Sequence, residues 1–213
     1  MFNIIKGFYI KVWKFRKGSE IFNMTVITHQ LNGLVFILLF LNIIYFVIGN
    51  DILLNFEYHY IFYFLLVAIL GSIFPDIDEP NSYIGRRFYF ISKLFKKIFG
   101  HRGFTHSLCG LVVFVLLFYF LIFFFFSNLI IYPYIFILFF GIGYLSHLIG
   151  DFITSNGIPL FYPFYDKRFS LSLFSTGSIG EYLFRIFLGF IFIFLLYLLF
   201  KDNLFELGHY FKE

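Results

Sequence analysis

Histidine and aspartate side chains gather beside the long apolar segments of this 213-residue sequence. These residue types are the ligands that divalent transition metals prefer in proteins. Ionisable groups at membrane depth also generally mark a functional site. A metal ion held by such ligands activates water and stabilises developing negative charge, which is the chemistry of hydrolysis. The sequence predicts seven metal ligands: His29, Asp76, Asp78, His101, His106, His147 and Asp151.

Two of the carboxylates follow a proline at the end of an apolar run. Pro75 is expected to end the preceding helix and to leave the next residues extended. Asp76 and Asp78 then occupy alternate positions, so they either chelate one cation or point apart. For this motif alone, a turn with solvated carboxylates is an equally good interpretation.

The segment His101–Ser107 brackets a glycine with two histidines and an arginine. Gly103 lets the backbone approach a ligand closely, and the planar guanidinium of Arg102 suits phosphate or carboxylate. A helix is expected to start near Thr105 or Ser107, where backbone amides favour anions. The segment therefore predicts a corner that binds an anionic substrate, with Arg102 as a catalytic residue. The alternative is an arginine that only binds lipid phosphate.

His147 and Asp151 are four residues apart, which places them on one face of a helix. This spacing presents two ligands to one metal, although a histidine bonded to an outer carboxylate is also common around metals. Small residues on the same run should let another helix pack closely: Gly141, Gly143, Ser146 and Gly150.

The first and last apolar runs each begin beside a further candidate. A lone histidine such as His29 at a membrane boundary is more often interfacial, but its place beside the other candidates favours a ligand. Glu181 is either a ligand or base, or a carboxylate favoured by the start of a helix. We expect Asp78 or Glu181 to take the proton of the attacking water. His59 and His209 fall on the opposite predicted side and are left out of the site.

The elements that must position these residues are membrane helices. The composition is 61% hydrophobic and 26% aromatic, and five runs are long enough to cross a bilayer. The sequence therefore predicts an all-α polytopic membrane helix bundle. The predicted spans are Leu31–Ile48, Tyr58–Phe74, Ser107–Ile131, Tyr134–Ile153 and Tyr182–Phe200.

Basic residues are distributed unevenly among the connections. Most of the 16 lysines and arginines lie before the first span or in the second and fourth connections. The positive-inside rule then places the N-terminus and the polar site in the cytoplasm and the C-terminus outside. Topology and anionic lipid explain these basic residues, so no nucleic-acid partner is expected.

Three segments outside the spans have their own expected roles. Residues 1–23 predict a basic amphipathic extension in the headgroup layer, ahead of a membrane domain over 24–201 and a short tail over 202–213. They lack the apolar core of a signal peptide, and Met24 is an alternative start. A second interfacial helix is expected over Arg86–Phe99. The stretch Thr154–Phe164 predicts a lid or re-entrant wall.

The polar motifs together resemble the YdjM-type family of membrane-bound, metal-dependent hydrolases of the inner membrane. The resemblance covers approximately Met24 to Glu181. It is carried by Thr28-His29, Phe74–Asp78, His101–Ser107, Ser146-His147, Asp151 and Pro163. It implies metal-dependent hydrolysis in an inner membrane and implies no particular substrate.

Seven candidate ligands exceed the three that usually hold one catalytic zinc. The sequence therefore predicts two divalent ions, zinc or manganese, in preference to one ion with some candidates in an outer layer. Because the site lies at headgroup level, the expected substrate is an anionic, lipid-like ester or phosphoester. The alternatives are a metal-free phosphatase with a histidine nucleophile and a metal sensor or transporter.

Overall fold

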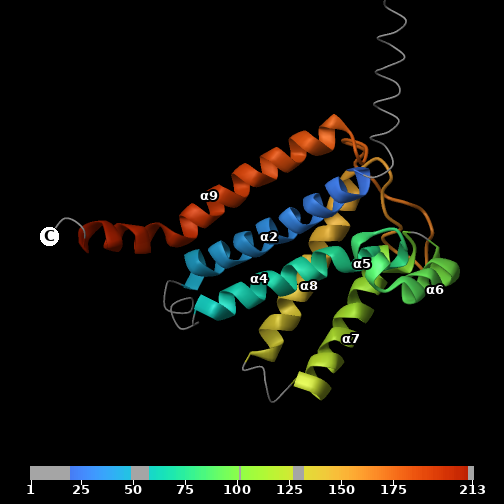
Figure 1. Cartoon of the computed structure of the whole chain (residues 1–213), viewed down its shortest axis with the longest axis horizontal. Helices are drawn as coiled ribbons and strands as arrows, with labels where there is room; N and C mark the ends of the chain where they lie inside the picture. The colour runs from blue at the N-terminus through green and yellow to red at the C-terminus, as the bar shows by residue number, and fades with distance from the viewer. Residues whose placement is uncertain (1–19, 49–57, 101, 127–131, 211–213) are drawn as a thin grey trace, which may run out of the picture.

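The computed structural model describes residues 20–48, 58–100, 102–126 and 132–210. Within these ranges most of the chain is helical, and five helices are long and apolar enough to cross a membrane. The predicted all-α membrane bundle with five spans is therefore confirmed (Figure 1). The long helices are α2 (Glu20–Ile48), α4 (Tyr58–Ile73), α7 (Leu108–Phe126), α8 (Pro133–Ile153) and α9 (Ile179–Tyr210).

The start of the first span differs from the prediction. Helix α2 begins at Glu20 rather than Leu31, and the span covers Val26–Val47. The helix continues through polar residues because neighbouring helices satisfy them. The Asn32 amide donates to the carbonyl of Ser146 on α8 at 2.6 Å. The prediction that His29 precedes the span was therefore wrong, since it lies inside it.

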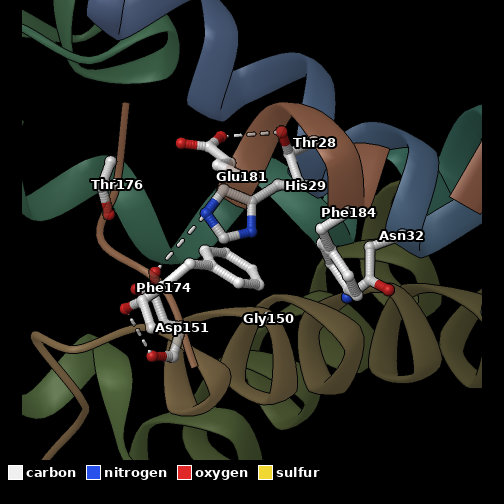
Figure 2. A pocket seen from close by; sticks show the side chains of 10 residues that line it. Thr28, His29, Asn32, Gly150, Asp151, Phe174, Thr176, Glu181 and Phe184 are labelled. Atoms are coloured by element: carbon white, nitrogen blue, oxygen red, sulfur yellow. Dashed lines mark hydrogen bonds and ion pairs between the residues drawn. The ribbon is translucent and has the colours of Figure 1, made fainter. Parts of the chain in front are cut away.

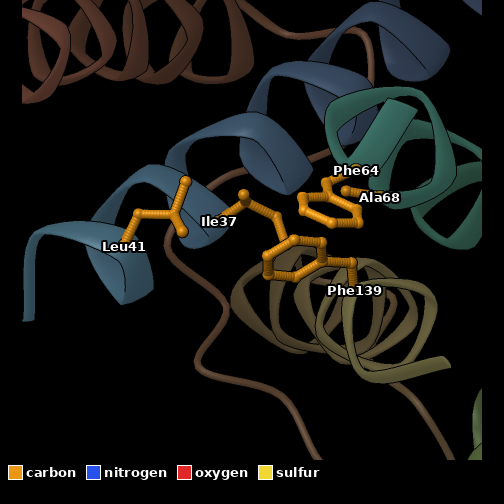
Figure 3. Close-up of a cluster of buried hydrophobic side chains, with 5 residues drawn as sticks. All are labelled: Ile37, Leu41, Phe64, Ala68 and Phe139. Atoms are coloured by element: carbon orange, nitrogen blue, oxygen red, sulfur yellow. The ribbon is translucent and has the colours of Figure 1, made fainter. Parts of the chain in front are cut away.

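An apolar core joins α2, α4 and α8 in the middle of the bundle (Figure 3). Ile37 and Leu41 of α2 meet Phe64 and Ala68 of α4, and Phe139 of α8 closes the cluster. The ring of Phe64 lies edge-on to that of Phe139, with centroids 4.9 Å apart. Aromatic pairs favour this arrangement, and it fixes the three helices against one another.

Glycines bring the backbones of α4 and α8 into direct contact. A Cβ atom on Gly143 would lie 2.1 Å from the carbonyl oxygen of Ala68, and one on Gly71 would lie 2.2 Å from that of Phe140. Neither position has room for a side chain. Small residues give this close approach in membrane bundles, and here it brings the polar end of α8 against the end of α4.

Four short helices cover one end of the bundle: η1 (Phe74–Asp78), α5 (Tyr83–Arg87), α6 (Tyr89–Phe99) and η2 (Phe104–His106). Residues Asp76 to Asp78 were expected to be extended, but they form the 3-10 helix η1 with Pro75 in its first turn. Proline fits this position because a first-turn amide has no helical acceptor. The helix predicted over Arg86–Phe99 is represented by α6 and the end of α5. The predicted N-terminal extension lies largely outside the described residues.

The segment after α8 folds back over the same end. Thr154 and Ile158 form isolated β-bridges with Phe174 and Phe169. Ile158 is fully buried among the aromatic side chains of α7 and α8. The Leu160 carbonyl accepts a hydrogen bond from the first amide of α7 at 3.0 Å. The segment therefore forms a wall at this end of the bundle.

Candidate metal centre

Side chains from η1, η2 and α8 converge at the end of the bundle where α4 meets α8. The Nε2 atoms of His106 and His147 are 3.2 Å apart. Asp151 Oδ2 lies 3.4 Å from His106 Nε2 and 3.6 Å from His147 Nε2. Asp76 Oδ1 lies 3.7 Å and 3.8 Å from the same two nitrogens. Two imidazoles and two carboxylates thus point toward one volume.

The ligand atoms of Asp76, His106 and His147 lie within 4.8 Å of one another, as do those of His29, His147 and Asp151, so two candidate groups overlap at His147. The oxygen Asp151 Oδ2 is buried and accepts no hydrogen bond. A buried carboxylate oxygen is costly without a donor or cation, so the residues fit a divalent ion.

The backbone of α4 orients His147. The Nδ1 atom lies 2.7 Å from the carbonyl oxygen of Ser72, next to the close contact between α4 and α8. A carbonyl can only accept, so Nδ1 carries the proton and Nε2 presents its lone pair to the cluster. Metal-binding histidines are commonly held this way. Sequence reasoning missed Ser72, because a backbone carbonyl has no signature in the sequence.

Asp78 lies behind His106 and outside the four-atom cluster. One oxygen, Oδ2, is 3.2 Å from His106 Nδ1 and accepts from the hydroxyl of Thr105 at 2.6 Å and the amide of Arg102 at 2.9 Å. The structure therefore places Asp78 where it can orient a ligand. Thr105 had been considered only as a helix cap. The cap of α7 is instead Ser107, whose hydroxyl accepts from the Gly110 amide at 3.0 Å.

Arg102 joins the cluster through Asp151. Its NH2 group donates to Asp151 Oδ1 at 2.9 Å, and the pair is buried. Its NH1 group is also buried and has no hydrogen-bond partner. One nitrogen of the guanidinium is therefore left to donate to a ligand oxygen. The amides at the start of α7 contribute less to anion binding than expected, because the first of them already donates to the carbonyl of Leu160.

His29 stands on the other side of Asp151, beside a small pocket (Figure 2). Its ring stacks on that of His147 with centroids 3.8 Å apart, and Nε2 is 3.6 Å from Asp151 Oδ1. Its Nδ1 atom is buried without a hydrogen-bond partner. The pocket has about 300 Å³ of empty space, including the part open to solvent, and Phe174 and Phe184 form its apolar side.

Glu181 lines the same pocket but is engaged by other groups. Its Oε1 accepts from the Thr28 hydroxyl at 2.8 Å, and its Oε2 accepts from the Gly177 amide at 2.6 Å. Arg185 lies 3.5 Å from Oε1. Glu181 belongs to neither of the groups whose ligand atoms lie close enough to share an ion. Glu181 therefore links α9 to α2 through its hydrogen bond with Thr28. His101, the remaining predicted ligand, lies outside the described residues.

The charges of the cluster favour a cation. With neutral histidines, the carboxylates of Asp76, Asp78 and Asp151 face the single guanidinium of Arg102, so a divalent ion would balance them. Burial disfavours the protonated form of His106, but Asp78 and then the other two carboxylates outweigh it and raise the pKa of His106 to about 10. Without a metal, a proton on His106 partly fills the role of the cation.

The fold and the cluster define a class: a polytopic helical membrane protein with a buried histidine and aspartate centre at one end of its spans. A family profile described as YdjM inner membrane protein matches residues 24–204. The chain therefore belongs to the YdjM family.

Individual relatives match part of the chain. It is 45% identical over 96 residues to the inner membrane protein YdjM of Escherichia coli (strain K12), and equally to that of Shigella flexneri. Each match covers 45% of this chain and 47% of the relative, so it spans about half the length of those proteins. It is 38% identical to YvsG of Bacillus subtilis (strain 168) over 130 residues, which are 59% of this chain and 75% of YvsG. No solved structure matches.

Proposed function

We propose that this membrane protein is a metal-dependent hydrolase that cleaves an ester or phosphoester bond of an anionic, lipid-like substrate. One observation carries the proposal: Asp151 Oδ2, buried and without a donor, faces the Nε2 atoms of His106 and His147 at 3.4 and 3.6 Å. Such an arrangement is stabilised when a cation takes the shared position.

One ion is the simpler assignment, because the two candidate groups share His147. His106, His147, Asp76 and Asp151 would hold it, in the four-atom cluster described above. A second ion beside His29 would need Asp151 Oδ1, and that oxygen already accepts from the Arg102 guanidinium at 2.9 Å. A cation placed there would be repelled by the guanidinium at short range. Zinc is the expected metal that most often takes four histidine and carboxylate ligands.

The ion would supply Lewis acidity and activate water, as divalent metals do in hydrolases. The protein's own groups supply the rest. Arg102 NH1, the buried donor without a partner, stabilises negative charge on a phosphoryl or acyl oxygen. His29, whose Nε2 lies 3.6 Å from Asp151 Oδ1, would accept the proton of the attacking water. Asp78 and Glu181, the bases expected from the sequence, are occupied by donors and hold other residues in place.

Exposure indicates where the substrate enters. The Asp76 side chain is 20% exposed, whereas those of His106, His147 and Asp151 are at most 1% exposed. The cluster is therefore open beside η1, at the end of the spans. A bond at headgroup level reaches this side without crossing the apolar core, and Arg102 suits a negatively charged group next to that bond.

Metal analysis of the detergent-purified protein tests the proposal. We expect about one equivalent of zinc or manganese in the wild type and in Asp166→Asn, which removes an exposed carboxylate that belongs to neither candidate group. His106→Ala and Asp151→Asn should lose the metal, because each removes one of the ligands. Equal trace metal in all four proteins would refute the metal centre. Bound metal without hydrolysis of any lipid phosphoester or ester would refute the enzymatic part.

A further inference from the structure

Helix α6 presents a surface that neither the spans nor the metal centre uses. Its outer face carries four exposed apolar side chains: Phe90, Ile91, Leu94 and Ile98. Phe90 is 86% exposed, and the other three are 47–58% exposed. These positions fall on one side of the helix because residues three or four apart are neighbours. The row is thus a continuous apolar stripe that faces away from the protein.

Basic side chains border this stripe. Arg86, Arg87, Lys93 and Lys97 are all exposed, and no ion pair within the described part of the chain engages them. Lys93 and Lys97 are one turn apart and lie along the edge of the stripe next to Phe90. An apolar stripe with lysines along its edge is the pattern of a helix that lies in the headgroup layer.

The opposite face of α6 is fastened to the protein, so the helix cannot rotate to bury its apolar stripe. Ser92 is fully buried, and the ring of Phe95 packs on that of Phe114 with centroids 5.9 Å apart. The Lys96 ammonium lies 2.7 Å from Glu79, directly after η1. The apolar stripe is therefore held outward in a fixed orientation.

The attachments of α6 also reach both segments that carry ligands. Glu79 follows the η1 turn that bears Asp76. At the other end of the helix, a Cβ atom on Gly103 would lie 2.0 Å from the carbonyl of Phe99. The ring of Phe99 stacks on that of Phe104 with centroids 5.2 Å apart, and Phe104 begins η2. Helix α6 is thus attached to both segments that carry ligands.

We propose that α6 is a binding surface for the anionic phospholipids of the leaflet next to the metal centre. The acyl chains cover the stripe of Phe90, Leu94 and Ile98, and the lipid phosphates pair with Lys93 and Lys97. Apolar burial gives the contact its strength, and the lysines give a preference for anionic over zwitterionic headgroups. The surface does not require bound metal, so its test is independent of the proposed hydrolysis.

Site-specific fluorescence in nanodiscs tests this surface. An environment-sensitive fluorophore is attached to Leu94→Cys or Lys93→Cys in a Cys109→Ala background. We expect acyl-chain nitroxide lipids to quench the label at position 94 more strongly than the label at position 93, and iodide in the buffer to do the opposite. Equal iodide quenching at both positions would overturn the proposal. Protection of position 94 from both quenchers would also overturn it, because protein would then cover the stripe.

The preference for anionic lipid is measured with the label at position 94. At equal mole fraction, nitroxide phosphatidylglycerol should quench it more than nitroxide phosphatidylcholine does. A lysine near an anionic surface contributes about 1 kcal/mol, which is about a fivefold change in preference. The double variant Lys93→Gln and Lys97→Gln should lower the ratio of phosphatidylglycerol to phosphatidylcholine quenching by about fivefold or more. The control Lys201→Gln, in the C-terminal part of α9, should leave this ratio unchanged. Equal quenching by both lipids in the wild type would refute the anionic preference.

Discussion

Replacement of Asp78 by asparagine tests whether Asp78 orients the metal ligand His106 or binds the metal itself. The carboxylate lies 3.2 Å from His106 Nδ1, and both side chains are at most 1% exposed. A buried hydrogen bond to a charged group is worth about 1.5–3 kcal/mol. Loss of such a partner behind a metal-bound histidine weakens metal binding about 10–100-fold, which corresponds to about 1.4–2.8 kcal/mol. We therefore expect Asp78→Asn to raise the Kd for zinc by this factor.

The assay is a competition titration of purified protein against a chromophoric zinc chelator, with the stoichiometry measured at saturating zinc. Asp78→Asn should still bind one equivalent at saturation, whereas Asp151→Asn should not. The exposed variant Asp166→Asn serves as the control and should match the wild type. Loss of the full equivalent in Asp78→Asn would refute the reasoning, because Asp78 would then bind the ion directly. An unchanged Kd would refute the coupling between Asp78 and His106.

Three further predictions concern stability, packing and topology. Chelation of the metal should lower the melting temperature, because an ion present at about 100 times its Kd stabilises the fold by about 2.7 kcal/mol; an unchanged temperature would argue against a bound ion. Gly143→Ala should destabilise the protein by about 1–3 kcal/mol in thermal unfolding, because its Cβ would lie 2.1 Å from a backbone oxygen of α4. As the control, Gly189→Ala should be neutral, because its Cβ would meet nothing within 4 Å. In intact cells, an impermeant thiol reagent should label Lys201→Cys but spare Lys167→Cys, both in a Cys109→Ala background; the reverse pattern would invert the predicted orientation.

The spans and most of the cluster could be predicted from the sequence for simple physical reasons. Long apolar runs have few alternatives to crossing a bilayer, and His147 and Asp151 share a helical face because they are four residues apart. The glycines of α8 indicated a close helix contact, and Gly143 lies against the backbone of α4. That contact is what brings η1 next to η2 and α8.

The roles of individual polar residues depended on tertiary contacts that no local pattern encodes. Asp76 and Asp78 look equivalent in sequence, but the turn of η1 directs one toward the cluster and the other toward His106. The start of α2 was misplaced because Asn32 and Thr28 look unsuited to a span. They are tolerated there because α8 and α9 supply an acceptor for each.

The four-atom cluster has a consequence for how the protein is made. Its atoms come from Asp76, His106, His147 and Asp151, which are separated along the chain by two spans and their connections. A nascent chain that ends before residue 151 lacks a complete set of donors. The proposed ion would therefore find its complete set of donors only after α8 has been synthesised.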